Sequence, residues 1–275
     1  MSLIKHMIDL PYLKNMKALI QITMQKLSGI SLLGITLITL ISPLHAADTK
    51  PLIIGVDMFS PPFVMQGGKK EFYGFDISMM MSLCKLMERT CQFEQFKWVD
   101  LLAAVSTNKV DLAVSSITIT ADRARKMNFS LPYSLSYSRF IARSDHLIKE
   151  PFSTESLNNK RIGAYQGTVY ESNISKFGIK NPIIKTYPGY EEALRALKNN
   201  EVDFILLDSP TALYWAANSS GAFKTVGKPI IYGYGIGIAI SPDNAALIPE
   251  INKALLNYQD SQDYQSNYHR YLEEF

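Results

Sequence analysis

The sequence predicts an α/β protein with two similar lobes and largely parallel sheets. Strand-like and helix-like patterns alternate along residues 51–207, which is typical of parallel strands joined by crossover helices. The same order of elements occurs twice, with local sequence similarity between the copies. The chain has 275 residues, 47% of them hydrophobic. A chain of this length can hold two lobes of about a hundred residues, each with its own core.

The first series of elements contains three short strands and two helices. Short apolar runs predict the strands, and longer stretches with apolar residues at helical spacing predict the helices. In chain order they are a strand over 51–56, a Met-rich helix over 76–89, a strand over 91–96, a helix over 99–108 and a strand over 110–114.

The second series repeats this order. It consists of a strand over 161–164, a helix over 169–177, a strand over 183–186, a helix over 190–200 and a strand over 202–207. A further strand pattern, 238–240, follows the glycine-rich residues 233–237. These glycines begin no amphipathic helix, so we interpret them as a flexible crossing strand and not as a nucleotide-binding loop.

The two series resemble copies of one unit. Residues 104–112 match residues 196–204, with Ala, Asn and Val-Asp in register, and residues 54–56 match residues 162–164. Two similar α/β halves predict two lobes facing one another across a cleft. Ligand groups are then expected at the carboxyl ends of the parallel strands.

Those strand ends are rich in polar residues. They are Asp57 and Ser115-Ser116 in the first half, and residues 165–168 and Leu207-Asp208 in the second. Asp111 and Asp203 also repeat in both halves, and we interpret them as structural residues of a turn or strand end.

The N-terminal segment, residues 1–46, is predicted to be a secretory signal peptide. Lysines as far as Lys26 precede an uncharged run over 27–41, and small residues follow it. The run is shorter than the roughly 20 residues of a membrane span. We expect cleavage near Ala46 or Ala47 and a periplasmic mature protein; an uncleaved membrane anchor is the alternative.

Charge and cysteine content narrow the class of function. Residues 1–46 hold four of the 28 basic and one of the 25 acidic residues, so the remainder carries 24 of each. A formally neutral body has no basic footprint for nucleic acid. In an exported chain Cys84 and Cys91 favour a disulfide, because tetrahedral zinc needs two further ligands. Two free thiols are the alternative.

Catalytic and metal chemistry receive little support. Two of the four histidines lie in the signal segment, and His146 and His269 have no Cys or paired acid at ligand spacing. We therefore expect no zinc site, no Ser-His-Asp triad and no cofactor.

The most informative motif covers residues 115–123. A strand is predicted to end there, hydroxyl groups and free backbone N–H groups follow, and Arg123 lies at the start of a helix capped by Thr120. Such a position suits a ligand carboxylate. An ordinary capped helix with a solvent-facing Arg123 is the alternative.

Several stretches form a collinear pattern over nearly the whole mature chain. They are Gly55-Val56-Asp57 with Pro61-Pro62-Phe63, Gly74-Phe75-Asp76-Ile77, residues 110–113, residues 115–123, Phe129-Ser130 with Pro132-Tyr133, residues 166–168 and Leu207-Asp208. This pattern resembles the periplasmic polar amino-acid receptors of ABC importers (solute-binding protein family 3). That family includes lysine/arginine/ornithine, histidine, arginine and glutamine binding proteins. The Cys84/Cys91 spacing resembles the disulfide of its basic amino-acid branch.

The resemblance implies a two-lobed periplasmic binding protein fold with a ligand cleft between the lobes. The second lobe, residues 136–237, would be inserted in the first, residues 47–135 and 238–275. The implied function is to close on a free amino acid and deliver it to an ABC permease in the inner membrane. We expect a monomer with no catalytic residues.

The resemblance also implies roles for the polar groups that hold the common part of the ligand. Arg123 would clamp the α-carboxylate, aided by Thr118 and the backbone N–H of Thr168. Asp208 and the carbonyl of Ser116 would receive the α-ammonium. A simple helix cap is the alternative role of Asp208.

Other residues would surround the ligand side chain. Asp57 and Ser115 would face it, Trp98 would stack on it, and Tyr165 would line its pocket from the second lobe. The family's basic branch places an aromatic residue where this chain has Ser60, so one aromatic wall of that pocket is missing. A turn cap for Asp57 and a plain core position for Trp98 are the alternatives.

The expected ligand is a cationic amino acid, with arginine ahead of lysine or ornithine. Arg123 and Asp208 balance the α-carboxylate and α-ammonium, so one extra positive charge balances Asp57. Glutamine is the competing ligand. From another class of protein, a cyclohexadienyl dehydratase-like enzyme on the same fold is the alternative, which would need a general acid in the cleft.

Overall fold

The computed structural model describes residues 50–68, 71–147 and 152–273. The predicted signal peptide and its cleavage site therefore lie outside the described residues. None of the helices in the described part is both long and apolar enough to cross a membrane.

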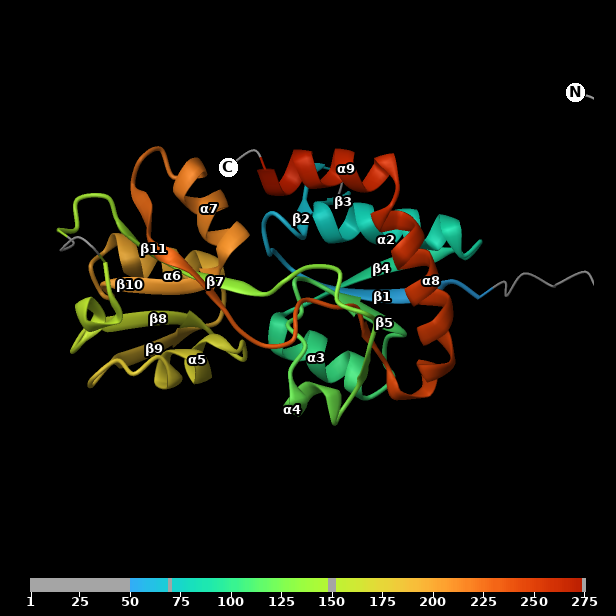
Figure 1. The fold of residues 1–275 in the computed structure, drawn as a ribbon, viewed down its shortest axis with the longest axis horizontal. Helices are drawn as coiled ribbons and strands as arrows, with labels where there is room; N and C mark the ends of the chain where they lie inside the picture. The colour runs from blue at the N-terminus through green and yellow to red at the C-terminus, as the bar shows by residue number, and fades with distance from the viewer. Residues whose placement is uncertain (1–49, 69–70, 148–151, 274–275) are drawn as a thin grey trace, which may run out of the picture. The chain divides into compact units, whose positions relative to one another are not determined.

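Two five-stranded sheets organise the described residues (Figure 1). The first sheet, in the order β4-β1-β5-β12-β6, contains β1 (Leu52–Asp57), β4 (Cys91–Phe96), β5 (Leu112–Val114), β6 (Asn128–Phe129) and β12 (Ala239–Ile240). The second, in the order β11-β7-β10-β8-β9, contains β7 (Tyr137–Arg143), β8 (Arg161–Tyr165), β9 (Ile183–Tyr187), β10 (Phe204–Asp208) and β11 (Phe223–Ile231). A small hairpin pairs β2 (Met65–Gln66) with β3 (Phe72–Tyr73).

The strand order confirms the predicted fold class. Strand β12 follows all strands of the second sheet in the chain, yet it pairs with β5 and β6 of the first. The second lobe is therefore inserted in the first. The residues at which each lobe begins and ends remain a prediction. We call the elements built on the first sheet lobe 1 and those built on the second sheet lobe 2.

Helices cover both faces of each sheet (Figure 1). Lobe 1 carries α2 (Phe75–Leu86), α3 (Trp98–Ser106), α4 (Ala121–Ala124), α8 (Ile248–Gln259) and α9 (Gln262–Tyr268). Lobe 2 carries α5 (Tyr170–Lys176), α6 (Tyr190–Lys198) and α7 (Ser209–Asn218). Two 3-10 helices, Thr154–Leu157 and Pro242–Leu247, and a π-helical turn, His269–Glu273, complete the described helical segments.

Three apolar clusters form the core. One lies between the first sheet, α2 and α8 and includes Phe75, Met79 and Leu255. A second includes residues of both α3 and α6, and the third packs α5 against the second sheet. The predicted disulfide is present: Cys84 in α2 is bonded to Cys91 at the start of β4, which ties this helix to the edge of the first sheet.

The sequence repeat is also a structural repeat. Parallel strands β1 and β5 pair Ile54 with Leu112, and β8 and β10 pair Ile162 with Phe204 in the same relation. The Asp111 carboxylate accepts the N–H of Ile53 at 2.7 Å, and the Asp203 carboxylate accepts the N–H of Arg161 at 2.8 Å. Both aspartates thus join the start of one strand to the chain that leads into its parallel neighbour.

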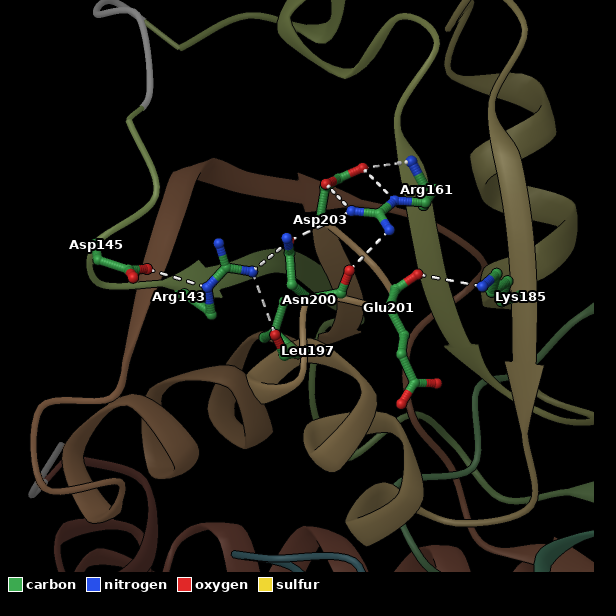
Figure 2. Close-up of polar contacts among 8 residues, drawn as sticks. All are labelled: Arg143, Asp145, Arg161, Lys185, Leu197, Asn200, Glu201 and Asp203. Atoms are coloured by element: carbon green, nitrogen blue, oxygen red, sulfur yellow. Dashed lines mark hydrogen bonds and ion pairs between the residues drawn. The ribbon is translucent and has the colours of Figure 1, made fainter.

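In lobe 2 this strand-end contact is extended by arginine side chains (Figure 2). Arg161 Nη2 donates to Asp203 Oδ1 at 2.7 Å, and Arg161 Nη1 donates to the carbonyl of Asn200 at 2.7 Å. Arg143 Nη1 donates to Asn200 Oδ1 at 2.8 Å. This network joins the amino ends of β8 and β10, whereas the predicted ligand groups lie at the opposite, carboxyl ends.

Candidate functional site

The polar residues predicted to bind ligand are brought together by four parallel strands. Asp57, Tyr165 and Asp208 are the last residues of β1, β8 and β10, and Ser115-Ser116 follow β5 directly. Because β1 is parallel to β5 and β8 is parallel to β10, the carboxyl ends of each pair meet at one edge of their sheet, as the repeat predicts.

A small cavity lies among these strand ends and is lined by residues of both lobes. Its lining consists of Trp98, Ser115, Ser116, Thr118, Arg123, Thr168, Val169, Tyr170, Tyr190 and Asp208. Asp57, Ser60 and Tyr165 are not among the lining residues and lie behind or beside them.

Arg123 is held by the segment that the sequence singled out. The Thr120 hydroxyl accepts the N–H of Arg123 at 3.2 Å and caps α4, and Arg123 Nη1 donates to the carbonyl of Thr118 at 2.9 Å. The guanidinium carbon lies 5.4 Å from the centroid of the Trp98 ring, a cation–π distance. Burial lowers the pKa of Arg123, and the nearby Tyr232 and Asp208 oppose this effect. The side chain lines the cavity, so the solvent-facing alternative does not describe it.

Asp208 is a buried carboxylate surrounded by hydroxyl donors. The Ser116 hydroxyl donates to it at 2.9 Å, the Tyr232 hydroxyl donates at 2.9 Å, and Tyr170 forms a further side-chain hydrogen bond. Burial raises the pKa of Asp208 above its ordinary value, although these bonds and the Arg123 cation oppose the shift. The carboxylate makes no capping bond to α7, so the helix-cap alternative fails.

Asp57 lies beside the cavity and is only 1% exposed. The Tyr165 hydroxyl donates to its two carboxylate oxygens at 3.2 and 3.3 Å, and the N–H of Met58 donates to Oδ1 at 2.8 Å. The N–H of Asp57 donates in turn to the Ser115 hydroxyl at 2.8 Å. Burial raises the pKa of Asp57 to about 7, because desolvation outweighs the hydrogen bonds that favour the ionised form.

Two predicted residues have partners within the protein that bear on their roles. Trp98 stacks with the Arg123 guanidinium while it lines the cavity. The backbone N–H of Thr168, predicted to reach the ligand carboxylate, donates to the carbonyl of Tyr165 at 3.3 Å, and the Thr168 hydroxyl donates to the same carbonyl at 2.6 Å. Contacts of both residues with a ligand remain a prediction.

The sequence predicted no role for Asp76, although this residue belongs to Gly74-Phe75-Asp76-Ile77, one of the stretches that resemble the receptor family. Its fully buried carboxylate accepts the N–H of Ser116 at 2.7 Å and the hydroxyl of Tyr133 at 2.9 Å. Ser116 has a left-handed φ of 52°, which these contacts hold in place. Burial raises the pKa of Asp76 to about 7. The sequence did contain a sign of this role, because Asp76 is the acidic residue in the first turn of the Met-rich helix and its neighbours Phe75 and Ile77 are apolar.

Three tyrosines of the site, Tyr170, Tyr190 and Tyr232, were also missed. They are buried or half-buried, and burial raises the pKa of each. Tyrosine at the start of a helix resembles ordinary core, so composition gave no warning. The internal repeat did contain a signal for one of them, because Tyr190 occupies the position of Trp98.

The repeat relates residues that meet across the cavity. Asp57 and Tyr165 end β1 and β8 and hydrogen-bond to each other. Ser116 and Asp208 occupy matching positions at the ends of β5 and β10, and they also hydrogen-bond to each other. Trp98 and Tyr190 are the first residues of α3 and α6, and both line the cavity. The site is therefore built from three pairs of equivalent positions, one member from each lobe.

The arrangement combines one cation and two carboxylates in a small enclosed space. Arg123 can pair with a carboxylate, and Asp208 can accept a hydrogen bond from an ammonium group. Asp57 can bind a second cationic group if that group replaces the Tyr165 hydroxyl at its carboxylate. Buried charges of this kind are stable only when paired. The residues thus suit a zwitterion with one further polar or positive group.

Comparisons with known proteins agree with this geometry. Residues 52–274 match the model of the bacterial extracellular solute-binding proteins, family 3. ABC transporter arginine-binding protein 1 of Escherichia coli (strain K12) is 31% identical over 226 residues, covering 80% of this chain and 90% of that protein. A crystal structure of an arginine 3rd transport system periplasmic binding protein from Legionella pneumophila has a TM-score of 0.76 and 34% identity, covering 81% of this chain and 99% of the other.

One solved structure on this fold concerns an ancestor of an enzyme. The ancestral amino-acid-binding protein AncCDT-1, described as a precursor of cyclohexadienyl dehydratase, has a TM-score of 0.72 and 25% identity, covering 80% of this chain and 95% of the other. The relatives named above are all described as binding proteins. With a family model that spans nearly all the described residues and a relative of this similarity, the chain belongs to the bacterial extracellular solute-binding proteins of family 3.

Proposed function

We propose that the chain is the periplasmic receptor of an ABC importer and binds a cationic amino acid, arginine in preference to lysine or ornithine. The observation that carries the proposal is the charge set of the site: one half-buried cation, Arg123, and two buried carboxylates, Asp57 and Asp208. An arginine zwitterion with its guanidinium supplies one negative and two positive charges, which neutralise this set. The names of relatives that bind arginine support the same ligand class.

The proposed binding mode follows from the two ends of the cavity. Arg123 pairs with the α-carboxylate, and Asp208, with the Ser116 carbonyl beside it, accepts the α-ammonium. The guanidinium then extends toward Asp57, displacing the Tyr165 hydroxyl from that carboxylate. The receptor performs no covalent chemistry, functions as a monomer, and passes its ligand to a permease that recognises the closed form.

Glutamine is the competing ligand for a specific physical reason. With its pKa raised to about 7, Asp57 holds a proton in a large fraction of molecules near neutral pH. A neutral carboxylic acid accepts an amide without leaving an unpaired charge. Arginine, in contrast, draws Asp57 into its ionised form, and the resulting ion pair in an enclosed site favours arginine.

A thermal-shift screen of the twenty amino acids, ornithine and citrulline tests the proposal on the mature chain. A ligand that binds only the native state raises the melting temperature as its concentration increases. We expect arginine to give the largest shift, and an absence of any shift with arginine, lysine and ornithine would refute the proposed ligand class. Incubation with prephenate or arogenate, followed by product detection, tests the enzymatic alternative, for which we expect no product.

A further inference from the structure

We infer that Tyr190 of lobe 2 provides the second aromatic wall of the ligand side-chain pocket and determines the preference for arginine over lysine. The inference rests on the proposed function and adds a specificity residue to it. The sequence suggested that one wall is missing, because Ser60 stands where an aromatic residue was expected.

Tyr190 lies between the cavity and the protein surface. It is the first residue of α6, only 6% exposed, and it lines the cavity together with Trp98. It also lines an outer groove that Tyr165, Glu191 and Glu192 border. Its ring thus separates the buried cavity from that groove, as a wall does.

Tyr190 is a neighbour of Ser60 in lobe 1. The Ser60 side chain lies close enough to the Tyr190 hydroxyl to lower its pKa, so the two side chains are neighbours. Ser60 itself is only 2% exposed. A larger side chain at position 60 would therefore compete with Tyr190 for the same space. The small residue in lobe 1 and the large residue in lobe 2 fit each other.

Tyr190 also lies beside the position proposed for the ligand side chain. Its ring packs on Tyr165 with centroids 4.7 Å apart, and the Tyr165 hydroxyl reaches Asp57. Asp208 and Asp57 are proposed to hold the α-ammonium and the guanidinium of the ligand. Both lie near enough to the Tyr190 hydroxyl for their charges to raise its pKa. Tyr190 therefore lies beside the path from the α-ammonium site to the side-chain site.

The repeat supplies an independent reason. Trp98 and Tyr190 are equivalent residues, each the first of a nine-residue helix, and each faces the shared cavity from its own lobe. A flat guanidinium stacks on aromatic faces better than a compact ammonium does. Two rings from the two lobes thus favour arginine, and the second ring reaches the ligand only when the lobes close.

The test compares the dissociation constants of arginine and lysine by calorimetry in the wild type, Tyr190→Leu and Tyr190→Phe. We expect Tyr190→Leu to weaken arginine about 10-fold, equal to about 1.4 kcal/mol, and lysine about 3-fold or less. Tyr190→Phe keeps the ring and should stay within about 3-fold of wild type for both ligands. Tyr187→Leu is the matched control: Tyr187 ends β9 nearby but does not line the cavity, so the arginine/lysine ratio should not change.

A rescue variant separates the wall from a general packing role. In Ser60→Phe/Tyr190→Leu the aromatic group returns to lobe 1, in the space that Tyr190 vacates, and the preference for arginine should return. Equal weakening of both ligands in Tyr190→Leu, with no rescue, would overturn the inference. If the wild type binds neither ligand, the proposed function fails instead. That outcome is distinguishable, because it is seen before any variant is made.

An isosteric series covers the case in which Tyr190→Leu does not fold. Phenylalanine bearing zero, one or three ring fluorines at position 190 keeps the shape of the wall while weakening the negative face of the ring. We expect arginine affinity to fall stepwise along the series. Constant affinity would contradict the inference.

Discussion

At the scale of single residues, the site depends on buried charges whose partners are specified on every side. Asp208 is surrounded by three hydroxyl groups, Asp57 by the Tyr165 hydroxyl and the N–H of Met58, and Arg123 by a carbonyl and the Trp98 ring. Contacts made within one lobe, such as those of Arg123 with the Thr118 carbonyl and of Asp208 with the Tyr232 hydroxyl, hold these groups in place before a ligand arrives. Preorganisation of this kind reduces the ordering cost of binding.

Removal of the Arg123 guanidinium should abolish binding of every amino-acid ligand. The group would pair with the α-carboxylate common to all of them, and loss of one partner of a desolvated charge pair costs about 2 to 5 kcal/mol. Arg123→Ala should therefore bind arginine at least about 30-fold more weakly, as measured by calorimetry. Arg125→Ala, two residues away with a side chain 70% exposed, is the control and should bind like the wild type. Near-native affinity in Arg123→Ala would disprove the carboxylate assignment.

Arginine affinity should depend on pH through Asp57. Its pKa is raised to about 7 in the protein, and a cationic ligand favours the ionised form, so binding releases a proton. Affinity should rise about 10-fold between pH 6 and pH 7.5 and level off above that range. The Asp57→Asn variant should lose most of this dependence. The buried Asp76 and Asp208 have raised pKa values too, and because both remain in Asp57→Asn, any slope left in the variant reports on them.

The sequence identified Arg123, Asp57 and Asp208 because polar residues directly after buried strands are visible in the pattern. Asp76 and Tyr190 were not recognised for the opposite reason. One is an acid within the predicted Met-rich helix, and the other is an aromatic at a helix start, and both resemble structural positions until their partners are known.

At the scale of elements, the turn after β8 controls how closely lobe 2 approaches α3. Gly167 in this turn has a φ of +75°, and a Cβ added to it would lie 2.8 Å from Cγ1 of Val99 in α3. Glycine suits this position for two reasons: the backbone is left-handed, and Val99 leaves no room for a side chain. The contact joins the two lobes.

Gly167→Ala should weaken arginine binding by about 10-fold, because the added methyl group would meet Val99 and oppose closure. The left-handed backbone adds strain of about 1 kcal/mol, which lowers the stability of the fold whether or not a ligand is bound. Calorimetry on Gly167→Ala/Val99→Ala separates the two effects. Val99 is 46% exposed, so its truncation alone should cost little, and the double variant should recover most of the affinity. A double variant as weak as Gly167→Ala would show that the steric contact is not responsible.

The strand-end network of lobe 2 should contribute to stability and not to binding. Burial alone would raise the pKa of Asp203, but the hydrogen bonds from Arg161 outweigh it, so the pKa is lowered. A lowered pKa stabilises the fold at neutral pH, and this contribution disappears as the pH falls through the folded-state value. Asp203→Asn should lose about 1 to 2 kcal/mol at pH 7 in urea unfolding, with a smaller loss near pH 3 and unchanged arginine affinity. An equal loss at both pH values would contradict this account.

The sequence predicted an element correctly where one pattern covered the whole strand or helix. It did not predict the strands that border the connections between the lobes. The repeat predicted β1, β4 and β5 with their equivalents β8, β9 and β10, all parallel. It did not predict β7 and β11, which pair antiparallel with each other and lie outside the repeated unit. Their pairing joins residues 80 to 94 positions apart, from Arg143 with Phe223 to Tyr137 with Ile231, a relation that local periodicity does not contain.

At the scale of the whole molecule, the two related lobes each contribute one half of a charge-balanced site. The inserted topology and the disulfide were predictable, because the repeat, the family pattern and the cysteine spacing all lie in the sequence. The identity of the groups that meet across the cleft was only partly predictable, since Tyr165–Asp57 and Ser116–Asp208 become neighbours only after folding.

The central claim is that the site selects a cationic amino acid through Asp57. The most direct measurement is the ratio of the arginine and glutamine dissociation constants, determined by calorimetry at pH 7.5 for the wild type and Asp57→Asn. The account predicts that the wild type binds arginine more tightly than glutamine and that Asp57→Asn reduces this ratio by about 10-fold or more, as expected for an enclosed charge pair. A wild type that prefers glutamine, or a ratio that Asp57→Asn leaves unchanged, would contradict it.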